Sequence, residues 1–187
     1  MPSFEVTGSV DPLLKVHLNA GETIFCESGA MVAMDERLSL TGKSRGGIAS
    51  ALGRKLLNEE SFFQQKIAAE LGAGDVLLSP TLAGDVWILY VGSERYTIAD
   101  GCYLANTEGV KLGTKTQGLG KALFANTGAG LKGFFVQEAS GTGQLVVSGF
   151  GSMREVIVTP ENPQIIDNGH LVAWDSSLQY ELALNTG

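Results

Sequence analysis

The sequence has few of the side chains that build metal sites and disulfide frameworks. Among 187 residues there are two cysteines, Cys26 and Cys102, and two histidines. A disulfide framework or a zinc ribbon needs more cysteines at closer spacing, and a histidine-based metal site needs more imidazoles. We therefore expect neither a metal site nor a bound cofactor.

Positive charge is also scarce. Thirteen Lys and Arg stand against twenty Asp and Glu, which gives a formal net charge of −7. Binding to nucleic acid depends on Lys and Arg that neutralise phosphates. Nucleic acid is therefore not an expected partner.

The sequence contains no long apolar run, and we expect no N-terminal leader. No segment approaches the roughly 18 consecutive apolar residues of a membrane-spanning helix. The start, Met-Pro-Ser-Phe, has neither the basic region nor the apolar region of a signal peptide. We expect a cytoplasmic protein.

Glycine, in contrast, is abundant, and much of it belongs to a repeated motif. A small polar residue, Gly, two variable residues, an aliphatic residue and Ala occur three times, starting at Ser28, Asp100 and Asn168, which are 72 and 68 residues apart. A second string, at residues 72–79 and 141–148, repeats with a similar period. The spacing predicts one domain, residues 1–187, made of about three pseudo-repeats. Their approximate bounds are 1–70, 71–140 and 141–187.

The motif predicts turns between strands. Asp-Gly and Asn-Gly favour the type I′ turns of β-hairpins, because Gly, Asn and Asp accept a positive φ at low cost. The flanking residues alternate between apolar and polar, as in half-buried antiparallel strands. We therefore predict a mainly β fold, an internally repeated antiparallel β-sandwich. Cys26 aligns with Ile98 and Ile166 in the repeats, so it is expected in the core.

Two stretches interrupt the strand pattern and predict short helical excursions, at residues 42–57 and 113–133. In the first, Ile48, Leu52 and Leu56 recur at the spacing of an amphipathic helix. So short a helix is not stable alone in water. We expect this apolar stripe to lie in the subunit interface of a homo-oligomer, with the chain's own sheets as the alternative cover.

Basic residues gather around the same stretch. Lys43, Arg45, Arg54 and Lys55 lie close together in an otherwise acidic chain. One interpretation is a solvated helix face, and the other is a contact for an anionic partner such as a phosphate, a lipid headgroup or an acidic protein surface. A peripheral contact with a membrane is the less favoured form of the second interpretation.

The strings that resemble catalytic motifs lack the context that their chemistry needs. Residues 42–46 match Gly-x-Ser-x-Gly, but that elbow requires a parallel α/β sheet, and Arg37 stands where a P-loop would need Gly. Residues 128–133 match a dinucleotide fingerprint, yet a Phe-Phe-Val strand follows them instead of a helix. Cys102 and His170 share one repeat position, which leaves a Cys-His dyad as a less favoured alternative. No catalytic residue is assigned.

The motifs in order resemble the altered-inheritance-of-mitochondria family over nearly the whole chain. They lie at residues 21–22, 28–32, 46–47, 61–63, 72–76, 103–105 and 171–173. The resemblance implies a β-rich fold similar to that of the tryptophan RNA-binding attenuator protein. Eukaryotic relatives are linked to mitochondrial inner-membrane organisation, but an Arg-rich presequence is missing here, so the sequence looks like a bacterial member. The family supplies no catalytic residues to carry over.

These observations favour a binding role over catalysis. The leading hypothesis is a non-enzymatic scaffold that associates with itself or with another protein. The alternative is a small-ligand binding protein with a pocket at the junction of the repeats. An enzyme ranks third.

Overall fold

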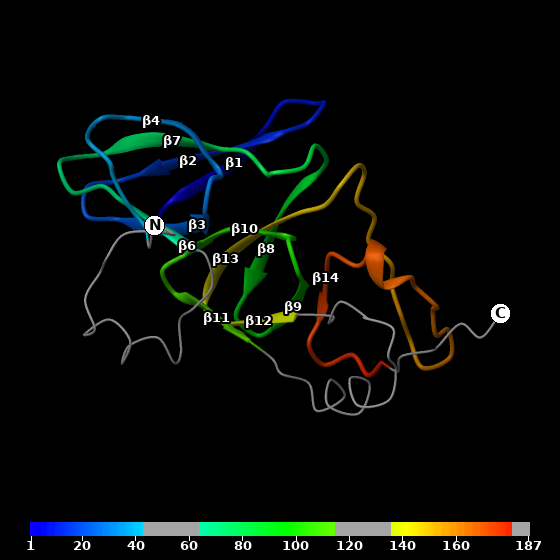
Figure 1. Ribbon diagram of the computed structural model, residues 1–187. Coiled ribbons are helices and arrows are strands. Elements are labelled where there is room, and N and C mark those ends of the chain that lie inside the picture. The colour runs from blue at the N-terminus through cyan, green and yellow to red at the C-terminus, as the bar shows by residue number, and fades with distance from the viewer. Residues whose placement is uncertain (43–63, 115–135, 181–187) are drawn as a thin grey trace, which may run out of the picture.

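The computed structural model describes residues 1–42, 64–114 and 136–180 (Figure 1). Within these ranges the chain forms fourteen strands in three antiparallel sheets and one short 3₁₀ turn, Asn168–His170. The mainly β prediction is thereby confirmed. The predicted helical excursions lie outside the described ranges, the first from residue 43 onward and the second from residue 115 onward.

The strands of the three sheets are interleaved along the chain (Figure 1), and each sheet is named here by its position in the molecule. The N-terminal sheet has the order β1 (Ser3–Thr7), β2 (Leu13–Leu18), β7 (Gly74–Leu78), β4 (Met31–Met34). The central sheet has the order β5 (Ser39–Gly42), β6 (Gln64–Ala68), β3 (Thr23–Glu27), β10 (Tyr103–Thr107), β13 (Gly143–Ser148), β8 (Val86–Val91). The C-terminal sheet has the order β11 (Val110–Thr114), β12 (Val136–Gly141), β9 (Tyr96–Ala99), β14 (Ala173–Asp175).

The central sheet contributes side chains to two separate apolar clusters. In β13, Val146 belongs to the cluster that the central sheet forms with the N-terminal sheet, whereas Leu145 and Val147 belong to the cluster that it forms with the C-terminal sheet. Successive side chains of a strand point to opposite faces, so the alternation in β13 fills both clusters at once. Cys26 is fully buried in the first cluster, as the repeat alignment predicted.

The predicted type I′ hairpin turns are corrected by the structure. At the second motif copy the Cys102 amide donates to the Ala99 carbonyl at 3.2 Å, and Gly101 has a φ of 76°. Among the described non-glycine residues, Asp11 alone has a positive φ, so Asp100 keeps an ordinary backbone conformation. Only the third turn residue is left-handed, which defines a type II turn.

These turns also join strands of different sheets. The turn at Gly101 leads from β9 in the C-terminal sheet to β10 in the central sheet, and the turn at Gly29 leads from β3 in the central sheet to β4 in the N-terminal sheet. Type I′ turns are favoured in hairpins because their twist matches that of the two paired strands. Here the two strands beside the turn belong to different sheets, so nothing favours a type I′ turn.

The third motif copy differs from the other two. Gly169 lies in the 3₁₀ turn with a φ outside the left-handed region, and its amide donates to Asp167 Oδ1 at 2.9 Å. The Asp167 carboxylate thus forms a local turn with a backbone amide, as Asp side chains often do. The expectation of a hairpin at Gly169 was therefore wrong.

The second and third motif copies nevertheless pair in the same register. The second copy pairs with the strand that leads into the first copy, and the third copy pairs with the strand that leads into the second copy. Ala105 of β10 lies opposite Cys26 of β3, and Ala173 of β14 lies opposite Ile98 of β9. In each case the last residue of one copy faces the residue two positions before the previous copy. The β4–β7 and β10–β13 pairs also share an irregularity, between Met31 and Ala33 and between Tyr103 and Ala105. The division of the whole chain into three pseudo-repeats stays a prediction.

Candidate functional site

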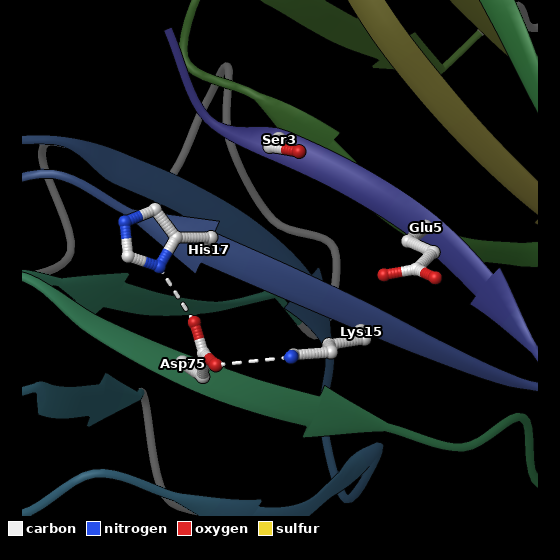
Figure 2. Close-up of a pocket in the computed structure, with 5 residues that line it drawn as sticks. All are labelled: Ser3, Glu5, Lys15, His17 and Asp75. Atoms are coloured by element: carbon white, nitrogen blue, oxygen red, sulfur yellow. Dashed lines mark hydrogen bonds and ion pairs between the residues drawn. The ribbon is translucent and has the colours of Figure 1, made fainter.

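A cluster of charged side chains covers the solvent face of the N-terminal sheet. His17 of β2 lies directly opposite Asp75 of β7, and its Nδ1 is 2.6 Å from Asp75 Oδ1. Lys15 Nζ lies 3.2 Å from Asp75 Oδ2. Together with Ser3 and Glu5 of β1, these three side chains line an open hollow of about 190 Å³. Figure 2 shows the five residues.

The cluster keeps Asp75 ionised. The hydrogen bond with His17 and then that with Lys15 lower the pKa of the Asp75 carboxyl below its ordinary value. The three side chains are 44 to 47% exposed, so water screens their attraction. The cluster is therefore a solvated ion-pair group with modest energetic weight.

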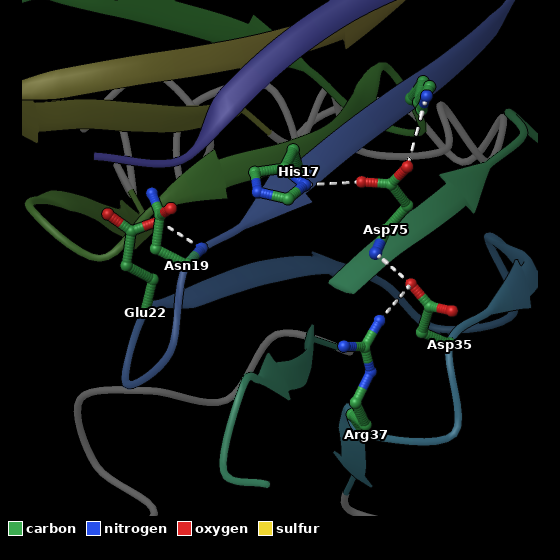
Figure 3. Close-up of polar contacts among 7 residues, drawn as sticks. His17, Asn19, Glu22, Asp35, Arg37 and Asp75 are labelled. Carbon is green, nitrogen blue, oxygen red and sulfur yellow. Dashed lines mark hydrogen bonds and ion pairs between the residues drawn. The ribbon is translucent and has the colours of Figure 1, made fainter. Parts of the chain in front are cut away.

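Neighbouring polar groups are paired with one another as well. The backbone amide of Asp75 donates to Asp35 Oδ2 at 2.7 Å, and Arg37 Nη2 lies 3.6 Å from the same oxygen (Figure 3). On the adjoining turn the Asn19 amide donates to Glu22 Oε2 at 2.9 Å. Most charged side chains of this face therefore form their hydrogen bonds and ion pairs within the chain.

The described residues of this face form no hydrogen-bonded pair of a nucleophile and a base. A carboxylate and an imidazole form a base, but a nucleophile must also lie within hydrogen-bond reach of the imidazole. The hydrogen bond of His17 goes to Asp75, and the hydroxyl of Ser3, which lies opposite His17 in β1 (Figure 2), forms no hydrogen bond with the imidazole. The same part of the chain holds no group of three or more His, Cys, Asp and Glu side chains that could bind a metal ion.

The cysteines have the properties of inert thiols. Burial raises the pKa of Cys26 to about 12, and burial followed by the charge of Asp100 raises the pKa of Cys102. Cys102 Sγ lies 3.9 Å from the Leu171 carbonyl, while His170 Nδ1 contacts Asp167 Oδ1 at 3.5 Å. The Cys-His dyad is not formed, because each side chain has a different partner and a raised pKa keeps the thiol protonated.

The site residues predicted from the sequence cannot be placed on this framework. Both predicted groups lie outside the described residues: the basic cluster Lys43, Arg45, Arg54 and Lys55, and the apolar stripe Ile48, Leu52 and Leu56. Their roles stay predictions.

A surface that the sequence reasoning missed lies between β13 and β14. The segment of residues 149–171 contains bridges and one 3₁₀ turn instead of named strands. Several of its large apolar side chains are exposed: Phe150, Val156, Ile157, Ile165 and Ile166. Ile165 is 97% exposed and Ile166 is 43% exposed, whereas Cys26 and Ile98, the counterparts of Ile166, are fully buried. That contrast between aligned positions was not visible in the sequence.

The free edge of β4 shows the same contrast. Val32 is 54% exposed and Ala33 is exposed, whereas their counterparts in β10, Leu104 and Ala105, are fully buried. β10 has a strand on each side, but β4 ends the N-terminal sheet and pairs with β7 alone among the described strands. The exposed segment and this edge form our candidate functional site.

The whole chain can now be compared with known proteins. The family model described as mitochondrial biogenesis AIM24 matches residues 4–187. The chain belongs to this family. An uncharacterized protein of Streptococcus pyogenes serotype M6 is 31% identical over 182 residues, which cover 94% of this chain and 71% of that protein.

A solved structure shows the same fold. The X-ray crystal structure of another Streptococcus pyogenes protein, a structural genomics target, has a TM-score of 0.77 and 26% sequence identity. The match covers all of this chain and 82% of that one. The expected membership of the AIM24 family is confirmed, and its relatives here are bacterial. The likeness to the tryptophan RNA-binding attenuator protein stays an expectation.

None of the helical segments in the described ranges is both long enough and apolar enough to cross a membrane.

Proposed function

We propose that this AIM24 family member is a non-enzymatic scaffold that associates with itself, or with another protein, through unpaired strand edges. The observation that carries the proposal is the set of exposed apolar side chains on residues 149–171, led by Ile165, Ile157 and Phe150 at 97, 78 and 81% exposure. Exposed apolar residues that gather in one region are typical of interaction sites.

Sheet edges that no other described strand covers support the same proposal. An edge strand offers a row of free amides and carbonyls to another strand, and proteins usually protect it with charges or proline. β4, with the sequence Met-Val-Ala-Met, carries neither. The central sheet ends in β8, Val-Trp-Ile-Leu-Tyr-Val, which is also without charge or proline.

The chemistry of the described residues supports the non-enzymatic part. The charged cluster around Asp75 is half exposed and paired within the chain. Both thiols have raised pKa values. The hollow beside Asp75 lies on the outer face of one sheet, so it gives no support to a ligand pocket at a repeat junction.

The proposal includes a cytoplasmic location and a protein partner. Cys26 and Cys102 are free thiols, which suits a reducing compartment. A net charge of −7 disfavours nucleic acid as the partner.

Measurement of molar mass tests the proposal. Sedimentation equilibrium and multi-angle light scattering from low to high micromolar protein should show species larger than one chain, in proportions that depend on concentration. In parallel, capture from a native lysate with mass spectrometry would identify a different protein partner. A monomer at every concentration that captures nothing contradicts the proposal.

A further inference from the structure

We infer that the free edge of β4 in one molecule binds residues 164–167 of a second molecule as an added antiparallel strand. This inference rests on the proposed self-association and names the two surfaces that meet. The occupant is a second copy of this chain.

The pairing geometry comes from two examples within the molecule. In both, the last residue of a motif copy lies opposite the residue two positions before another copy: Ala105 opposite Cys26, and Ala173 opposite Ile98. The first motif copy ends at Ala33, in β4, and the residue two positions before the third copy is Ile166. The same rule therefore places Ala33 opposite Ile166.

Both members of this third pair lack a partner in the described structure. β4 is the last strand of the N-terminal sheet, and residues 164–167 belong to no strand. Three of the four residues in the first two pairs are fully buried: Ala105, Cys26 and Ile98 have no exposed surface, and Ala173 is partly buried. Ala33 and Ile166 are both exposed, so their association would remove apolar surface from water.

The sequence of residues 164–167, Gln-Ile-Ile-Asp, suits a strand. Ile165 and Ile166 are β-branched and favour extended backbone. Pro163 precedes them, at a position where a strand tolerates a missing amide. The added strand would place Ile165 opposite Met34, by continuation of the same register.

The positions of the two surfaces make the partner a second molecule. β4 lies at one end of the protein and the segment before β14 lies at the other (Figure 1). Each molecule thus carries one acceptor edge and one donor segment at opposite ends. Such a heterologous contact builds head-to-tail chains, or rings where the rotation closes.

Cross-linking between singly substituted molecules tests the register. Residues opposite each other in antiparallel strands have Cα atoms about 4.5–5.5 Å apart, within disulfide range. We expect a mixture of Ala33→Cys and Ile166→Cys proteins to form a mixed disulfide dimer under mild oxidation. Wild-type protein is the first control, because Cys26 and Cys102 have raised pKa values.

The matched control shifts the thiol by one residue. Ile165 is more exposed than Ile166, so a thiol there is at least as accessible, but in the added strand it points to the other face. Mixed with Ala33→Cys, the Ile165→Cys protein should give at least about tenfold less dimer than Ile166→Cys gives. Equal yields from both mixtures would overturn the register.

Further outcomes separate this inference from the proposed function. A chain that carries both Ala33→Cys and Ile166→Cys and forms only an internal disulfide would overturn the inference in favour of closure within one molecule. Association in light scattering without the mixed disulfide would also overturn it, while the proposed function would stand. If wild-type protein neither associates nor captures a partner, both fail.

A substitution without a thiol provides an independent check. Ile166→Lys places a charge on an exposed side chain, so folding measured by circular dichroism should be unchanged. Its mass distribution should shift to the monomer. An unchanged mass distribution counts against the inference.

Discussion

At the scale of single residues, backbone conformation separates glycines that look equivalent in the sequence. Gly101 and Gly169 hold the same place in two motif copies, yet only Gly101 has a left-handed φ. The motif could therefore predict that a turn occurs at these places. It could not predict the turn type, because the side chain of Asp167, outside the motif, changes the third copy.

Gly101 is expected to resist substitution for reasons of backbone alone. A Cβ atom there would contact nothing within 4 Å, so Gly101→Ala should cost only the strain of a left-handed φ, about 1–2 kcal/mol of unfolding free energy. Gly92 also has open space but an ordinary φ, so Gly92→Ala is the matched control and should cost almost nothing. Urea unfolding of both variants measures the difference. Equal midpoints would refute the turn assignment.

Asp75 is expected to give the fold an acid-sensitive component. Its folded-state pKa lies below the ordinary value, so its pairs with His17 and Lys15 stabilise the fold while the carboxylate is charged. That contribution is present at neutral pH and is lost as pH falls through the folded-state pKa. Asp75→Asn should therefore lower the melting temperature slightly at neutral pH and have less effect in strong acid. A penalty of the same size at both pH values would show that the carboxylate charge is not involved.

Cys102 is expected to react slowly. Because burial and then the charge of Asp100 raise the pKa of its thiol, little thiolate exists at neutral pH. Alkylation by iodoacetamide, followed by mass spectrometry, should be slower for the native protein than for urea-unfolded protein at the same pH. Faster alkylation in the native state would restore the Cys-His dyad as a candidate.

At the scale of elements, local patterns predicted strands better than their partners. Residues 13–18 alternate clearly and form β2, and the turn after Cys26 was placed correctly. The sheet that each strand joins depends on pairings between residues far apart in the sequence. The strands on either side of the predicted hairpin turns therefore lie in different sheets, which the local pattern did not predict. The candidate site was missed for the same reason. Ile166 is exposed because it pairs with none of the described strands, and its own sequence does not reveal this.

The two-sided core of the central sheet leads to a further prediction. Leu145 is fully buried in the cluster shared with the C-terminal sheet, so Leu145→Ala should cost about 2–5 kcal/mol of unfolding free energy. Leu82 is 62% exposed, and the same change there should cost less than about 1 kcal/mol. Chemical denaturation of both variants provides the comparison. Similar losses at the two positions would contradict the assignment of the core.

At the scale of the whole molecule, the apolar stripe outside the described residues gives a competing route to assembly. If Ile48, Leu52 and Leu56 lie in a subunit interface, their replacement by Ser, Gln and Gln should shift light scattering to smaller species while circular dichroism stays β-like. Loss of structure would instead assign the stripe to the core of one chain. Comparison with Ile166→Lys shows which surface dominates the association.

The sharing of the central sheet by two apolar clusters has a consequence for amide hydrogen exchange. β10 and β13 each have a neighbouring strand on both sides, so their amides are hydrogen-bonded within the sheet, and both strands carry side chains of both clusters. Local opening of either outer sheet leaves one of these clusters intact. Amides of β10 and β13 should therefore exchange last, at the rate of global unfolding, whereas amides of the two outer sheets can exchange earlier through local opening.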